Sequence, residues 1–136
     1  MMEKQSLILV VDDDFDSLEI IKRIVESGGY RVLSFLDPME ALEHMRREKP
    51  DLIITDLMMK AIDSGLSFSR LINHDPRFQG IPIILVTSAS KKRGFQVQIQ
   101  GEKSLERMGI NAYFDKPVDP SKLLAKMREL LSLPKE

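Results

Sequence analysis

Four apolar runs in this 136-residue chain each lead into side chains that could do phosphoryl or metal chemistry. In chain order, these side chains are the carboxylates of Asp12 and Asp13, the carboxylate of Asp56, the hydroxyl of Thr87 and the ammonium of Lys116. A carboxylate can attack phosphorus to form an acyl phosphate, and a nearby pair of acids offers the oxygen ligands that Mg²⁺ prefers. Asp56 most needs an explanation, because an acid at the end of a buried strand costs free energy unless something compensates it.

The apolar runs themselves predict the strands of a parallel sheet. Residues 52–55 are apolar or β-prone without alternation, which is typical of a strand that is buried on both faces. The five predicted strands are 7–11, 30–35, 52–55, 83–86 and 112–115. Ligands bind at the carboxyl ends of the strands in open α/β folds, so we expect the polar side chains to lie together at that edge.

Helical spacing and capping residues predict the elements between these strands. The predicted helix starts are Asp14 or Asp16, Asp37 before Pro38, and Asp119 before Pro120. The first helix is expected to close at Gly28-Gly29, the second to run towards Pro50, and a less well patterned third helix to lie between Leu66 and Asn73. Strand and helix alternate five times, with one weak helix, and this order predicts an α/β fold with a doubly wound, five-stranded parallel sheet.

Length and composition predict one globular domain. The chain is 43% hydrophobic and 30% charged, and we expect a single domain over residues 1–136 with its core at about 6–131. The net charge of −1 argues against direct binding to nucleic acid or to a membrane surface. The chain has no cysteine, and no apolar run near its start is long enough for a signal or membrane segment. We therefore expect a cytoplasmic protein.

The polar side chains also occur in the order of a known family. The motifs are Asp12-Asp13, Asp56 within DLIITDLMM, Thr87 within IPIILVTS and Lys116 within YFDKP. Each motif alone is weak, but four in order, each after an apolar run, are specific. On these motifs, which cover nearly the whole chain, the sequence resembles a CheY-like response-regulator receiver domain of two-component signalling. The resemblance implies a single receiver domain with a flavodoxin-like sheet of strand order 2-1-3-4-5.

The same resemblance implies a phosphoacceptor that uses Mg²⁺. Asp56 would take a phosphoryl group from a sensor histidine kinase or a phosphotransfer protein, and the group would later be lost through autophosphatase activity. The ion would be held by Asp13 directly, by Asp12 mainly through water, by Asp56 and by the backbone carbonyl of Met58. The resemblance thus implies a single-domain response regulator, not a conventional enzyme, whose phosphorylated form binds a downstream protein.

Three further residues would have roles after the phosphoryl group arrives. Lys116 would pair with Asp56 and then with a phosphoryl oxygen, as a point charge. In the family, the peptide bond between this lysine and the following proline is cis. Thr87 would turn towards the phosphoryl group and Tyr113 would move into the space released, so that these two residues form a switch.

The chain departs from the family pattern in two places. Thr87 and Lys116 lie 29 positions apart, several more than usual, and the segment 94–101 alternates apolar and polar residues with a period of two. We therefore expect an irregular or shortened helix four, with residues 91–101 outside it and its start near Glu102. The acceptor loop also differs, because Lys60 replaces a proline and a residue is inserted near Gly65.

Two other function classes remain open at this stage. The first is a pseudo-receiver, a binding module that keeps the fold without being phosphorylated. The second is a haloacid-dehalogenase-like phosphatase, a family that also orders Asp, Thr or Ser, and Lys on parallel strands, because the run Asp12-Asp13-Asp14 contains an Asp-x-Asp motif. That phosphatase family needs a further acidic metal motif after its lysine, for which Asp119 is a poor candidate, and it leaves Asp56 unexplained.

Overall fold

The computed structural model describes residues 5–56, 64–87 and 109–132. Within these ranges, five strands form one parallel sheet in the order β2-β1-β3-β4-β5. The elements in chain order are β1 (Leu7–Val11), α1 (Phe15–Ser27), β2 (Arg31–Phe35), α2 (Pro38–Met45), β3 (Leu52–Asp56), α3 (Ser64–His74), the 3-10 helix η1 (Pro76–Phe78), β4 (Ile83–Thr87), β5 (Ala112–Asp115) and α6 (Pro120–Leu131). The predicted α/β fold and the strand order 2-1-3-4-5 are confirmed.

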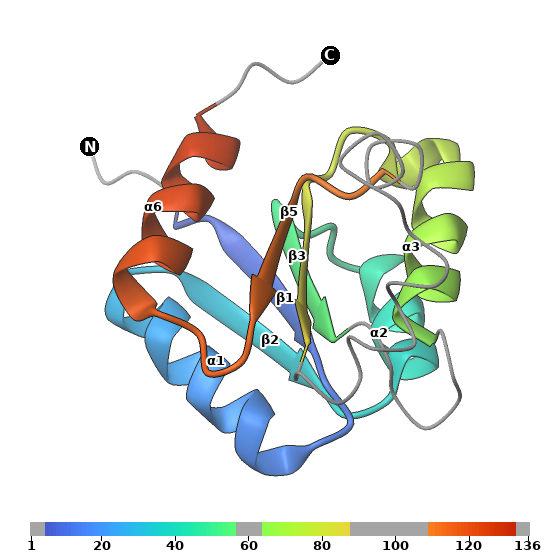
Figure 1. The fold of residues 1–136 in the computed structure, drawn as a ribbon. Helices are drawn as coiled ribbons and strands as arrows, with labels where there is room; N and C mark the ends of the chain where they lie inside the picture. Colours follow the sequence, from blue (N-terminus) through green and yellow to red (C-terminus); the bar gives the residue numbers. More distant parts are fainter. Residues whose placement is uncertain (1–4, 57–63, 88–108, 133–136) are drawn as a thin grey trace.

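Helices cover both faces of the sheet, with α1 and α6 on one face and α2 and α3 on the other (Figure 1). Every residue of β1, β3 and β4 is buried, which explains why these strands read as continuous apolar runs. Alternate residues of each strand enter two separate cores: Ile8, for example, packs with α1 and α6, whereas Leu9 packs with α2 and α3. The sheet is therefore held from both sides.

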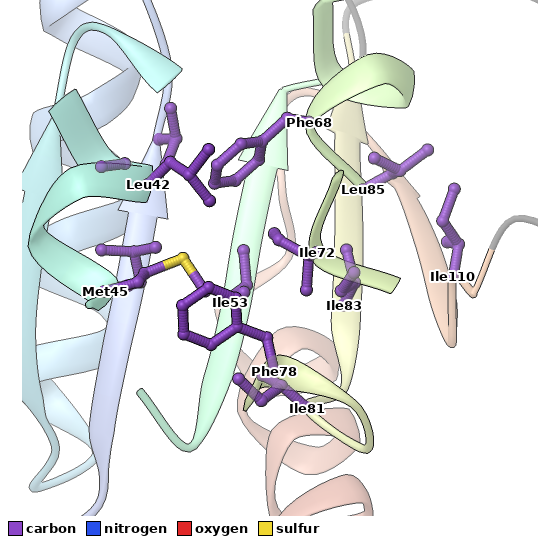
Figure 2. Close-up of a cluster of buried hydrophobic side chains, with 13 residues drawn as sticks. Leu42, Met45, Ile53, Phe68, Ile72, Phe78, Ile81, Ile83, Leu85 and Ile110 are labelled. Atoms are coloured by element: carbon purple, nitrogen blue, oxygen red, sulfur yellow. The ribbon is translucent and has the colours of Figure 1, made fainter. Parts of the chain in front are cut away.

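The core on the α2 and α3 face joins elements that lie far apart in the chain. Leu42 and Met45 of α2 meet Phe68 and Ile72 of α3 above Ile53 of β3 (Figure 2). Two side chains close this core from below, and they come from a segment for which the sequence predicted no element: Phe78 of η1 and Ile81. Asp75 caps η1, since its carboxylate accepts a hydrogen bond of 2.9 Å from the N–H of Arg77.

Acidic N-caps start three of the helices, as predicted. The carboxylate of Asp14 accepts from the N–H of Ser17, that of Asp37 from the N–H of Met39, and that of Asp119 from the N–H of Ser121. Gly29, with φ of +89°, follows the end of α1.

The predicted end of the second helix is wrong. The helix α2 ends at Met45 instead of running towards Pro50. There the Arg46 N–H bonds to the Glu43 carbonyl three residues back, at 3.3 Å, so the last turn tightens and the helix stops.

Several expectations lie outside the described residues. They are the irregular segment 91–101, the helix starting near Glu102, the acceptor loop around Lys60 and the backbone carbonyl of Met58. Among the helices in the described ranges, none is long and apolar enough to cross a membrane.

Candidate active site

The sheet brings the four predicted positions to one edge. Asp12 follows β1, Asp56 is the last residue of β3, Thr87 is the last residue of β4, and Lys116 follows β5. Because all strand pairs are parallel, these carboxyl ends face the same side of the molecule. Residues that are as many as 104 positions apart in the chain therefore come into contact.

Lys116 bridges two buried carboxylates. Its Nζ lies 2.8 Å from Oδ2 of Asp12 and 3.1 Å from Oδ2 of Asp56. The acid side chains are 1% and 0% exposed, and the lysine side chain is 17% exposed. Buried charges of this kind are tolerated only when they are paired and hydrogen-bonded, and Lys116 provides that pairing for both acids.

Burial and mutual contact shift the pKa values of Asp12 and Lys116. Burial raises the pKa of Asp12, while its hydrogen bonds to the Lys116 ammonium and the Asp14 N–H act in the opposite direction. For Lys116, burial disfavours the charged form, but the hydrogen bond to Asp12 and the attraction of both carboxylates outweigh it, so its pKa is raised. The lysine is thus held as an ammonium beside the Asp56 oxygen.

Three acids at this edge form a cluster with the composition of a metal site. Asp12, Asp13 and Asp56 each offer an oxygen, and these oxygens lie within 4.8 Å of one another. Asp13 is half-buried, whereas the other two are buried. Carboxylate oxygens are the donors that Mg²⁺ prefers, so the residues present fit this ion. The fourth predicted ligand, Met58, lies outside the described residues.

Backbone contacts hold the Asp12 carboxylate in place. Its Oδ1 accepts a hydrogen bond of 2.9 Å from the N–H of Asp14, and its own N–H donates to the carbonyl of Phe35 at 3.1 Å. The carboxylate therefore has one oxygen on a backbone N–H and the other on Lys116.

Thr87 and Tyr113 lie on the neighbouring strands β4 and β5. Thr87 is fully buried, and its carbonyl accepts a 2.8 Å hydrogen bond from the N–H of Lys116. The Lys116-Pro117 peptide bond is cis. Tyr113 packs against the core on the α2 and α3 face, and its hydroxyl donates to Oδ1 of Asp115 at 3.1 Å. In the strand register Asp115, the acceptor of the tyrosine hydroxyl, lies opposite Thr87, whereas Tyr113 lies opposite Leu85.

Two contacts at the site were not predicted. The first is the ion pair between Lys116 and Asp12, because the sequence suggested only Asp56 as the partner of the lysine. The second involves Thr55, whose buried hydroxyl donates to the backbone carbonyl of Asp56 at 3.1 Å. The sequence feature that could have indicated this contact is the single hydroxyl within the otherwise apolar residues 52–55.

Comparisons with known proteins agree with this geometry. A family model described as the response regulator receiver domain matches residues 8–128. The response regulator Rre1 of Synechocystis sp. is 33% identical over 133 residues, which are 97% of this chain and 54% of that protein. The polar-differentiation response regulator DivK of Brucella anthropi is 25% identical over 91% of this chain and 94% of its own.

A solved structure extends the comparison to the site. The receiver domain of sensor histidine kinase PA1611 from Pseudomonas aeruginosa superimposes with a TM-score of 0.77 at 25% identity, over 96% of this chain and all of that one. That structure holds a magnesium ion in its active-site cleft. This chain spans about half the length of Rre1 but nearly all of DivK and of the PA1611 domain. With its sheet order, its acidic edge and a family match over residues 8–128, the chain belongs to the response-regulator receiver family.

Proposed function

We propose that this chain is a phosphoryl acceptor of two-component signalling and that Asp56 is the residue phosphorylated. One observation carries the proposal: the buried Asp56 carboxylate lies 3.1 Å from an ammonium and within 4.8 Å of the oxygens of two further acids. A buried acid with these neighbours is poised to receive a charged group and to share its added charge with Lys116 and a cation.

The proposed step is an in-line transfer to an Asp56 oxygen. A carboxylate oxygen forms a bond to phosphorus while the bond from phosphorus to the donor breaks, and the donor leaves with the bonding electrons. With a phosphohistidine donor, the leaving group is the imidazole of a sensor histidine kinase or of a phosphotransfer protein. Lys116 is already within hydrogen-bond distance of Asp56 and would then bind a phosphoryl oxygen.

Asp12, Asp13 and Asp56 would hold Mg²⁺, together with the carbonyl of Met58. The bound ion would neutralise charge on the phosphoryl oxygens. Asp13 is the most accessible of the three acids, which fits direct ligation, whereas the two oxygens of Asp12 already bind Lys116 and a backbone N–H, which fits a role through water.

The output would be a change in protein binding. Thr87 and Tyr113 would form the switch that carries the phosphorylation to the surface, and the downstream partner would be a protein and not nucleic acid or membrane. We propose that the chain acts as a single-domain, cytoplasmic regulator that removes its own phosphoryl group. Its family membership leaves the haloacid-dehalogenase-like interpretation without support, so the pseudo-receiver is the alternative to be tested.

Intact-mass analysis after treatment with acetyl phosphate tests the proposal. We expect the wild-type protein to gain one phosphoryl group only when Mg²⁺ is present, and Asp56→Asn to gain none. Glu40→Gln, which removes an exposed acid on α2, serves as a variant in which labelling should be unchanged. Labelling that persists in Asp56→Asn, or that needs no divalent ion, would contradict the assignment, and an unlabelled wild-type protein would favour the pseudo-receiver.

A further inference from the structure

Asp14 lies at the junction between the acidic turn and the helix α1. Its backbone is extended, with φ of −94° and ψ of 116°, and the helix begins at the next residue. Its side chain is exposed and is not part of the acid cluster formed by Asp12, Asp13 and Asp56. Its interactions nevertheless connect that cluster to the helix.

Two hydrogen bonds of Asp14 point in opposite directions along the chain. Its N–H donates to Oδ1 of Asp12 at 2.9 Å, which closes a turn around Asp13. Its Oδ2 accepts from the N–H of Ser17 at 3.0 Å and so caps the first turn of α1. The carbonyl of Asp14 also accepts from the N–H of Leu18, whose side chain is buried, at 2.9 Å.

These hydrogen bonds connect the helix α1 to the charged residues of the site. The helix fixes Asp14 through two of its N–H groups, Asp14 then fixes one oxygen of Asp12, and the other oxygen of Asp12 binds Lys116. Asp13 lies inside the turn that Asp14 closes.

We propose that Asp14 is a positioning residue of the metal site: its cap on α1 holds the turn that aims Asp13 and Asp12 at the cation. The inference rests on the proposed Mg²⁺-dependent function. Groups that orient the ligands of a metal commonly change affinity about 10–100-fold when they are removed. Asp14 acts through its hydrogen bonds and needs no contact with the ion.

The substitutions Asp14→Ala and Asp14→Asn separate capping from charge. Asparagine caps a helix about as well as aspartate, whereas alanine does not. With Mg²⁺ as the only ligand in isothermal titration calorimetry, we expect Asp14→Ala to weaken binding at least about 10-fold and Asp14→Asn to stay within about 3-fold of wild type. Asp16→Asn removes an exposed charge from the same helical turn without removing the cap, and we expect it to match Asp14→Asn.

A second control addresses stability. Asp37→Ala removes the N-cap of α2, which is not part of the acid cluster, and should destabilise the fold to a similar degree while leaving Mg²⁺ affinity unchanged. In acetyl phosphate labelling, Asp14→Ala should need more Mg²⁺ for half of its maximal rate but should approach the wild-type rate at saturation.

The inference is overturned if Asp14→Ala binds Mg²⁺ like wild type, if Asp14→Asn is as weak as Asp14→Ala, or if Asp37→Ala weakens binding equally. Failure of the proposed function looks different: wild-type protein would then bind no Mg²⁺ in the calorimeter or would take up no phosphoryl group.

Discussion

At the residue scale, two acids of the acceptor site share one lysine as their ion-pair partner. Lys116 is the partner of two acids at once, and the 2.8 Å contact with Asp12 is shorter than the 3.1 Å contact with Asp56. Asp12 therefore helps to keep the ammonium in position beside the Asp56 oxygen. A lysine suits this arrangement, because its ammonium is a compact charge with three donors that can bind two or more oxygens together.

The hydroxyl of Tyr113 gives the first prediction at this scale. Burial, the charge of Asp115 and the hydrogen bond to it raise the pKa of Tyr113 to about 12. This value exceeds the value of about 10 for an unfolded tyrosine, so the contribution of the neutral phenol to stability is complete below about pH 10. That contribution is lost as the pH rises from about 10 to about 12. Asp115→Asn should lower the pKa but leave it above about 10, because burial remains.

Ultraviolet difference absorbance between wild type and Tyr113→Phe measures this transition, since Tyr30 is the other tyrosine in the chain. The same difference between Asp115→Asn and the Asp115→Asn, Tyr113→Phe double variant gives the value without the carboxylate. An unchanged Tyr113 transition in Asp115→Asn would show that the carboxylate does not act on the phenol.

At the element scale, the sequence predicted what depends on neighbours in the chain. The apolar strands and the caps at Asp37 and Asp119 are local patterns, and the structure has them. Sequence could not reveal the pairing of Lys116 with Asp12, because this contact depends on the spatial order of β1, β3 and β5. The end of α2 at Met45 was missed because a tightened last turn, with the Arg46 N–H on the Glu43 carbonyl, ends that helix before Pro50 is reached.

The close approach of Gly109 to the helix α3 gives a prediction that concerns glycine. Gly109 has a φ of +75°, and a Cβ there would collide with the side-chain amide of Asn73 on α3. Gly80 has a similar φ of +88°, but nothing lies within 4 Å of its Cβ position. Alanine at Gly80 should cost only the left-handed backbone strain, about 1–2 kcal/mol, whereas alanine at Gly109 should cost more, because the collision is added.

Urea denaturation of both variants measures the difference in the free energy of unfolding. Asn73→Ala removes the amide, so Gly109→Ala in that background should cost no more than Gly80→Ala does. Equal costs of the two glycine substitutions in the wild-type background would show that the close approach of Asn73 contributes nothing.

At the scale of the whole molecule, a well-packed sheet supports an unfavourable cluster of charge. Two apolar cores on opposite faces fix the five strands, and the strand ends then hold three carboxyl groups around one ammonium. Like charges so close together oppose folding until a cation or another positive group joins them. The fold thus gives up part of its stability to keep an acidic site that can bind a cation, as functional sites often do.

The last prediction follows from this conflict. Replacing Asp13 by Asn removes one charge from the cluster, so it should raise the free energy of unfolding of the metal-free protein by roughly 0.5 kcal/mol. The same substitution should reduce the stabilisation by Mg²⁺, which for wild type reaches about 2.7 kcal/mol when the free ion is at 100 times its Kd. Denaturation with and without Mg²⁺ should therefore reverse the order of stability of the two proteins. Asp16→Asn, outside the cluster, should show no such reversal. If Mg²⁺ stabilised Asp13→Asn as much as wild type, the ion would not be held by Asp13, and its link to the acidic edge would have to be abandoned.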